Sequence, residues 1–254
     1  KWFDQIIPIL KDHQISHGGP IIMMQICNEV GLQQWLAGCG DYNPVTLRYY
    51  SQFLNEKYKD IQSLNEVYVS EYISFEKVIP PHGNTESRPD IARYYDWHEF
   101  HRWYYSLYLD KLMSDLTLRG IQIPFYENVP GWVYGRAHEL PPCITMYAKA
   151  IQKRPELLLG LDHIPENVNF RNFHDAAIVS GMVQAMQGRK MPLFSAEFQA
   201  GSREHCVRTY PNELQLFYKS VLACGTQGWN YYMFSQGKNP KGEGVYGPTF
   251  YWDT

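Results

Sequence analysis

The sequence lacks several features that would assign it to a common class of protein. No apolar run is long enough to span a bilayer. The five cysteines are scattered and form no C-x-x-C pair, so neither a disulfide framework nor a structural zinc site is expected. No N-x-S/T acceptor for glycosylation occurs either. The cysteine pattern and this absence favour a reducing or bacterial setting.

Charge of one sign and phosphate-binding glycines are also missing. The formal net charge is -3, and no block of like charge occurs. This balance argues against nucleic acid or a membrane surface as a partner. The segment GCGDYN does not fit the G-x-G-x-x-G loop of nucleotide-binding folds, and it lies too far from the preceding apolar run.

Aromatic residues, in contrast, are abundant. They make up 15% of the chain, with 20 Tyr and 7 Trp among 254 residues. Tyr and Trp combine an apolar ring with a polar edge, which suits the apolar face and hydroxyl rim of a sugar. The alternative explanation is an aromatic-rich core.

Short apolar runs alternate with longer amphipathic stretches along the chain. The alternation predicts a parallel sheet of βα units, either doubly wound or part of a (β/α)8 barrel. Without a phosphate loop, we favour the barrel, an α/β fold. The predicted strands are 20–27, 120–126, 157–163, 191–198 and 228–234, and the predicted helices are 44–58, 95–118, 145–153, 173–187 and 213–223.

The ends of the chain indicate a piece of a longer protein. Lys1 stands directly before an amphipathic helix pattern, and the chain stops at FYWDT without a closing helix. By the eight-strand rule, about three βα units would lie in front of the first strand. Residues 1–254 would then form one catalytic domain covering about strands four to eight. Because such a piece has open sheet edges, we expect it to be poorly soluble or inactive by itself.

Two of the predicted strands end in a glutamate. PIIMMQICNE and PLFSAEF each consist of a Pro, an apolar run and then Glu29 or Glu197. In a barrel these ends meet at the catalytic face. Two carboxylates about 5–5.5 Å apart are the requirement of a retaining glycosidase. The alternative for each is a solvated loop residue or a partner of Arg or Lys.

These motifs resemble a known family. GGPIIMMQICNEVG, MPLFSAEFQAG and GWNYYMFSQG are similar to the acid/base strand, the nucleophile strand and strand eight of β-galactosidases of glycoside hydrolase family 35. The stretch FLNEKYKDIQSLNEVYVSEYISFEKVIPP is more similar to family 42 β-galactosidases. Both families belong to the same (β/α)8 clan, clan A, and the resemblance spans nearly the whole chain.

The resemblance implies roles for individual residues. Glu29, at the end of strand four, would be the acid/base, and Glu197, at the end of strand seven, would be the nucleophile. Asn28 would hydrogen-bond the 2-hydroxyl of the substrate, and Tyr232 would lie beside the nucleophile. Trp252 would line the sugar site.

Three further strand-end residues are candidate sugar contacts. Glu127 and Asn128 end the second predicted strand and His163 ends the third, where side chains of a barrel face the site. His163 could instead be a structural histidine. No residues show metal-ligand spacing. Family 42 proteins often carry a zinc-binding Cys cluster after the acid/base strand, but here only Cys39 occurs there. We therefore expect no metal and no cofactor.

The sequence thus predicts a retaining, exo-acting β-glycoside hydrolase, with β-galactosidase as the first expectation. The expected partner is a carbohydrate, with no role for nucleic acid or a membrane. Two alternatives stay open: a β-glucosidase or β-mannosidase of the same clan, and a non-catalytic carbohydrate-binding barrel.

Overall fold

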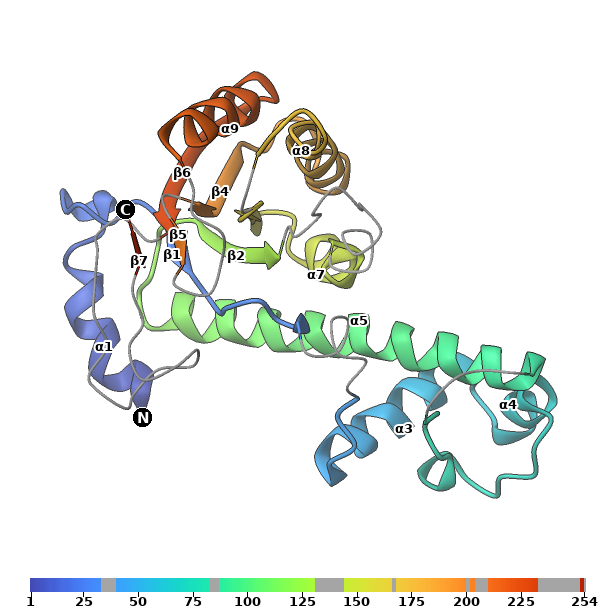
Figure 1. Ribbon diagram of the computed structural model, residues 1–254. Coiled ribbons are helices and arrows are strands. Elements are labelled where there is room, and N and C mark those ends of the chain that lie inside the picture. Colours follow the sequence, from blue (N-terminus) through green and yellow to red (C-terminus); the bar gives the residue numbers. More distant parts are fainter. Residues whose placement is uncertain are drawn as a thin grey trace, which may run out of the picture.

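A parallel β-sheet forms the centre of the molecule (Figure 1). The computed structural model describes residues 1–32, 40–82, 87–130, 144–165, 168–199, 202–203, 210–232 and 252–253. Five strands lie side by side in the order in which they occur in the chain, and all are parallel, as expected for consecutive βα units of a barrel. They are β1 (Met24–Gln25), β2 (Phe125–Pro130), β3 (Leu158–His163), β4 (Leu193–Gln199) and β6 (Thr226–Tyr232).

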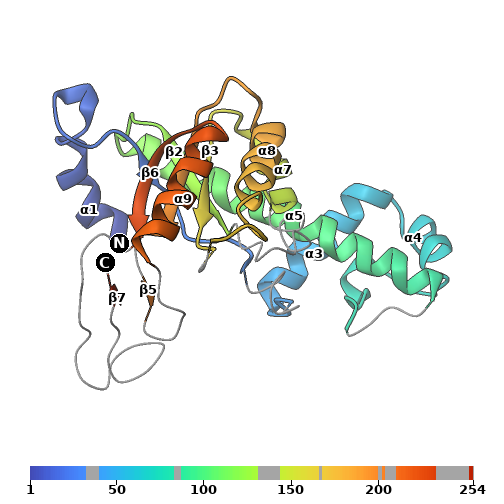
Figure 2. The ribbon, with the colours of Figure 1, turned by 45° about the horizontal axis from the view of Figure 1, so that its top comes forward.

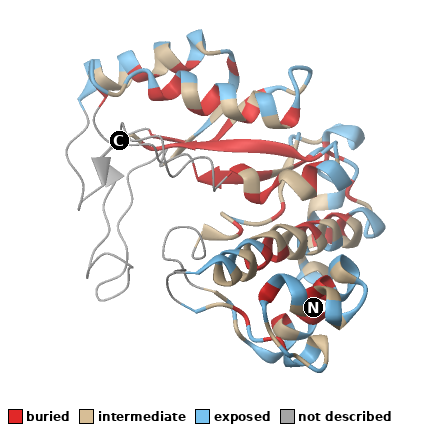
Figure 3. Ribbon diagram, turned by 90° about the vertical axis from the view of Figure 1, so that its right-hand side faces the viewer, coloured by how far each residue is buried: buried red, intermediate tan, exposed pale blue. Residues whose placement is uncertain are grey.

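Helices cover one face of this sheet (Figure 2). Along β3, Leu159 and Leu161 point to this face and belong to one buried cluster with Val179 and Val183 of α8. In Figure 3 the central strands β2, β3 and β4 are correspondingly mostly red, while the helices expose their outer sides. The helices that pack around the sheet are α1 (Trp2–Lys11), the second half of α5 (Arg88–Leu118), α7 (Ala148–Lys153), α8 (Asp175–Gln187) and α9 (Pro211–Ala223).

The opposite face of the sheet corresponds to the interior of a barrel. The Tyr126 ring meets the Phe194 ring edge to face there, at 5.3 Å between centroids. Gly160 lies between them, where an added Cβ would lie 2.7 Å from the Cβ of Ala196. The interior is therefore too tightly packed at this level to admit a side chain on β3.

A helical excursion separates β1 from β2 in the sequence. Its core consists of aromatic and aliphatic residues, among them the fully buried Tyr50, Leu64 and Phe100. Figure 1 shows these helices packed against the half of α5 that extends beyond the sheet. The excursion comprises α3 (Pro44–Tyr58), α4 (Ile61–Tyr68), the 3-10 turn η2 (Phe75–Lys77) and the first half of α5.

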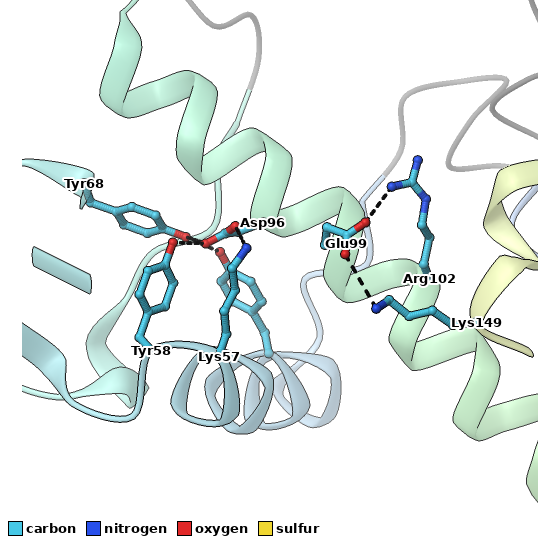
Figure 4. Close-up of polar contacts among 8 residues, drawn as sticks. Lys57, Tyr58, Tyr68, Asp96, Glu99, Arg102 and Lys149 are labelled. Atoms are coloured by element: carbon cyan, nitrogen blue, oxygen red, sulfur yellow. Dashed lines mark hydrogen bonds and ion pairs between the residues drawn. The ribbon is translucent and has the colours of Figure 1, made fainter. Parts of the chain in front are cut away.

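Asp96 connects α5 with α3 and α4 within the excursion (Figure 4). Its carboxylate, 2% exposed, accepts hydrogen bonds from Lys57 Nζ at 2.5 Å, Tyr58 OH at 2.6 Å and Tyr68 OH at 2.8 Å. A buried charge is tolerated when it is paired and hydrogen-bonded in this way. Much of the aromatic surplus is thus used in a helical core, the alternative that composition left open.

The α/β fold and the five predicted strands are confirmed, although every strand has somewhat different bounds and two differ by four residues or more. The first is reduced to Met24–Gln25, and the second begins at Phe125 instead of residue 120. The buried side chain of Gln14 explains the late start, because its Oε1 accepts hydrogen bonds from the backbone N–H groups of Gln122 and Ile123. Those groups are then unavailable for a strand ladder.

The helix predicted for 95–118 begins seven residues earlier, at Arg88. Ser87 caps it, since its hydroxyl accepts from the N–H of Asp90, and Pro89 occupies the first turn. The helix predicted for 44–58 has the same bounds in α3. No helix in the described part of the chain is both long enough and apolar enough to cross a membrane.

Candidate active site

Asn128 lies at the centre of a polar cluster at the carboxyl ends of the strands. Its Nδ2 lies 3.0 Å from Asp162 Oδ2, 3.3 Å from Glu197 Oε1 and 3.2 Å from Asn28 Oδ1. Its Oδ1 accepts from the backbone N–H of Glu29 at 2.8 Å. One fully buried amide therefore connects residues from β2, β3, β4 and the turn after β1.

Asp162 is a third carboxyl group between the two predicted catalytic glutamates. It is fully buried, accepts a hydrogen bond from Asn128, and is close enough to Glu29 to affect the pKa of that carboxyl. Burial is the main cause that holds the pKa of Asp162 well above its usual range, and the charges of Glu197 and Glu29 add to it. Burial and the two neighbouring charges therefore favour the neutral form of Asp162 over its carboxylate.

Glu29 stands in the turn after β1, with a left-handed backbone of φ 46°. Burial raises the pKa of its carboxyl, while the hydrogen bond with Asp162 acts in the opposite direction. A carboxylic acid that keeps its proton in the resting site is what a general acid requires.

Glu197 owes its direction to a β-bulge in β4. The register pairs Leu161 with Ser195 but Asp162 with Glu197, so that Ala196 is an additional residue. If residues 195 to 197 alternated regularly, with no bulge, Glu197 would share the helix-covered face with Ser195. Asn230 of β6 supports the bulge, since its Nδ2 donates to the carbonyl oxygen of Ala196 at 3.1 Å.

Two predicted sugar contacts are placed elsewhere by strand alternation. The His163 side chain, 3% exposed, packs on the helix-covered face, 5.8 Å from the Phe217 ring of α9, with Nδ1 3.2 Å from Ser195 Oγ. Glu127 is fully buried behind the turn that carries Glu29. Neighbouring residues of a strand point to opposite faces. Because Asn128 and Asp162 point to the open face of the sheet, Glu127 and His163 point away from it.

The remaining predicted contacts are distributed around the same end of the sheet. Asn28 is exposed beside Glu29. Tyr232, half-buried, ends β6 and pairs with Gln199 of β4. The backbone of Trp252 lies in β7 (Trp252–Asp253), which pairs antiparallel with β5 (Ser202–Arg203), while its side chain falls outside the described residues.

Asp162 and Gln25 were not among the predicted site residues. Gln25 Nε2 donates to Asn128 Oδ1 at 2.9 Å and to Asn28 Oδ1 at 3.3 Å. The period of two in LLLGLDH could have found Asp162, because it shares a face with Gly160 and not with the leucines. In the part of the chain described, no group of three or more His, Cys, Asp or Glu side chains is arranged to hold a metal ion.

Comparisons with known proteins show similarity to one enzyme family and to two curated proteins. Residues 3–247 match the model of glycoside hydrolase family 42, which is described as beta-galactosidase. A beta-1,2-glucosyltransferase of Ignavibacterium album is 47% identical over 254 residues, which is all of this chain and 35% of that protein. An exo-beta-D-glucosaminidase of Pyrococcus horikoshii is 25% identical, covering 95% of this chain and 31% of that protein.

A solved structure supports the fold. The beta-galactosidase of the psychrophilic Marinomonas ef1 superposes with a TM-score of 0.64 at 16% identity, over 87% of this chain and 34% of that chain. The chain thus has the fold of part of a (β/α)8 barrel. It spans about a third of the length of these relatives.

Proposed function

Because this chain belongs to glycoside hydrolase family 42, we propose that it carries both catalytic carboxyl groups of a retaining enzyme acting on β-linked sugars. The observation that supports this is the cluster in which Asn128 contacts Glu197 directly and Glu29 through its backbone, with Asp162 between them. Both glutamates extend from the carboxyl ends of strands, where barrel enzymes hold their active sites.

In this mechanism Glu197 attacks the anomeric carbon and forms a glycosyl-enzyme ester. Glu29 gives its proton to the departing glycosidic oxygen and becomes a carboxylate. In the second half it takes a proton from the incoming hydroxyl, which attacks the anomeric carbon and releases Glu197. Asn28, exposed beside Glu29, would hydrogen-bond the sugar's 2-hydroxyl. Tyr232 and Trp252 would contact the same sugar.

The incoming hydroxyl decides between two candidate activities. With water, the reaction is hydrolysis of a terminal β-galactoside, which follows the description of the family. With the hydroxyl of a second sugar, the reaction is transfer. The 47% identity to a beta-1,2-glucosyltransferase favours glucosyl transfer as the second candidate. Both candidates use the same two carboxyl groups.

The roles of the two glutamates can be separated in the full-length protein. Glu197→Gln should abolish turnover of every aryl β-glycoside, because no ester can form. Glu29→Gln should lose about 10²–10⁴-fold on a phenyl glycoside, but far less in the glycosylation step on a dinitrophenyl glycoside, whose leaving group needs no proton. Full activity in either variant on the phenyl glycoside would refute the assignment.

The sugar can be determined with a panel of aryl β-galactosides, β-glucosides and β-mannosides. Adding glucose or a β-1,2-linked disaccharide as an acceptor would distinguish the candidates, since transfer accelerates aryl release and yields a longer product. Binding of these sugars without any turnover would instead indicate a non-catalytic carbohydrate-binding barrel.

A further inference from the structure

The turn that carries Glu29 has a backbone that requires support. Glu29 has φ 46° and Gly31 has φ 88°, both in the left-handed region. For a residue other than glycine this conformation is strained and persists only where the surroundings hold it. The position of the Glu29 carboxyl therefore depends on what holds the turn.

Side chains from other elements hold this turn at successive peptide groups. Asn128 Oδ1 accepts from the N–H of Glu29 at 2.8 Å. Glu127 Oε1 accepts from the next N–H, that of Val30, at 3.2 Å, and Tyr147 OH donates to the carbonyl of Val30 at 3.0 Å. The adjacent residues Glu127 and Asn128 thus bind adjacent N–H groups, although alternation along β2 points them to opposite faces.

Glu127 is poorly suited to any role that requires contact with a substrate. Its side chain is fully buried, and Val30, to which it binds, is 9% exposed. Burial raises the pKa of Glu127 to about 8, against the opposing effect of hydrogen bonds from the N–H groups of Val30 and Cys27. A group that is inaccessible and mostly neutral near pH 7 can serve neither as a nucleophile nor as a sugar contact.

We propose that Glu127 is a positioning residue, which holds the carboxyl of Glu29 at the scissile bond by accepting the hydrogen bond of Val30 from behind the turn. The proposal rests on the proposed role of Glu29 as acid/base. Without an acceptor from Glu127, the N–H of Val30 would be buried and without a hydrogen bond, which is unfavourable. The turn could relieve this cost by moving to where the N–H finds another acceptor. Because a shift of about 1 Å can cost on the order of a hundredfold in rate, the position of Glu29 is sensitive to this contact.

The test compares Glu127→Gln with Glu127→Leu in the full-length protein. The amide of the first variant keeps an acceptor for Val30, whereas the second keeps the approximate volume without one. We expect Glu127→Gln to retain kcat/KM within about threefold and Glu127→Leu to lose roughly tenfold or more on a phenyl glycoside. On a dinitrophenyl glycoside the glycosylation rate of Glu127→Leu should be nearly unchanged, since no acid is needed.

A control is required for general destabilisation. Asp96→Asn disrupts the helical excursion, so it should lower stability without changing the ratio of rates on the two substrates. Equal losses of Glu127→Leu on both substrates would overturn the proposal, as would a Glu127→Gln variant as impaired as Glu127→Leu. If Glu29→Gln itself shows no dependence on the leaving group, the proposed function fails instead.

Discussion

Asp162 of β3 and Glu197 of β4 are register partners, and both side chains contact the amide of Asn128. The bulge at Ala196 makes this possible, because it turns Glu197 away from the helix-covered face. The candidate site is therefore defined by three carboxyl groups, of which the central one, Asp162, is fully buried and has a raised pKa.

Replacing Asp162 should shift the pH dependence of activity. The hydrogen bond with Asp162 lowers the pKa of Glu29, so its loss in Asp162→Ala should raise that pKa. Since Glu29 must be protonated to act as the acid, the alkaline limb of the kcat/KM profile should move to higher pH. The measurement is the pH profile on a phenyl glycoside.

Asp175→Asn provides the control, because Asp175 is also a buried carboxyl but lies at the start of α8. Its alkaline limb should match that of the wild type. An unchanged or lowered limb in Asp162→Ala would contradict the link between the two carboxyl groups.

Gly160 should tolerate no side chain. An added Cβ would lie 2.7 Å from the Cβ of Ala196, so Gly160→Ala forces the bulge to move. We expect a loss of about 1–3 kcal/mol in the free energy of unfolding, which is typical of overpacking, and a fall in kcat because Glu197 shifts. Urea unfolding and steady-state kinetics test the two effects.

Gly181, within α8, is the matched position. An added Cβ there has no neighbour within 4 Å, and Gly181 is not in the left-handed region. Gly181→Ala should stabilise the protein by about 0.5–1 kcal/mol, since alanine favours the helix, and leave kcat unchanged. A stable and fully active Gly160→Ala variant would show that the bulge does not need this space.

Two carboxylates on α5 should contribute differently to stability (Figure 4). Asp96 is 2% exposed and accepts three side-chain hydrogen bonds, so Asp96→Asn should cost about 2–3 kcal/mol. Glu99 pairs with Arg102 and Lys149 near the surface, so Glu99→Gln should cost less than about 1 kcal/mol. Chemical denaturation in parallel measures both, and equal costs would refute the distinction.

His163 should make the protein sensitive to acid. Burial lowers the pKa of His163 to about 4, whereas an unfolded chain has the usual value of 6.5. Between these values the unfolded state binds the additional proton, so stability is fully present above pH 6.5 and falls as the pH drops towards 4. His163→Gln should flatten this dependence. A change of up to about 3 kcal/mol over this interval follows from the two pKa values.

The measurement is the free energy of unfolding in urea at several pH values between 4 and 7. His101 of α5, whose pKa burial also lowers to about 4, should leave a remaining slope in the variant. An identical slope in wild type and His163→Gln would mean that His163 is protonated within the fold.

Local signals in the sequence determined many of the elements. The spacing of apolar residues predicts α3 with the bounds 44–58, and in the structure the Asn43 side chain caps this helix by accepting from two N–H groups of its first turn. The run at 157–163 likewise predicts β3 to within one residue. The helix α4 was not predicted, because its eight residues show only a short periodic pattern.

The sequence by itself also determined which residue types reach the strand ends, among them Glu29, Asn128 and Glu197. Only the tertiary structure decided which face each side chain occupies. The additional residue Ala196 reverses the alternation that the sequence would predict for Glu197. No local sequence pattern indicates this bulge. Along β3, alternation in the sequence separates Asp162 from His163, but only the covering helices decide that Asp162 is the one on the open face. A strand's faces become distinct only when helices cover one of them, and that is a property of the assembled fold.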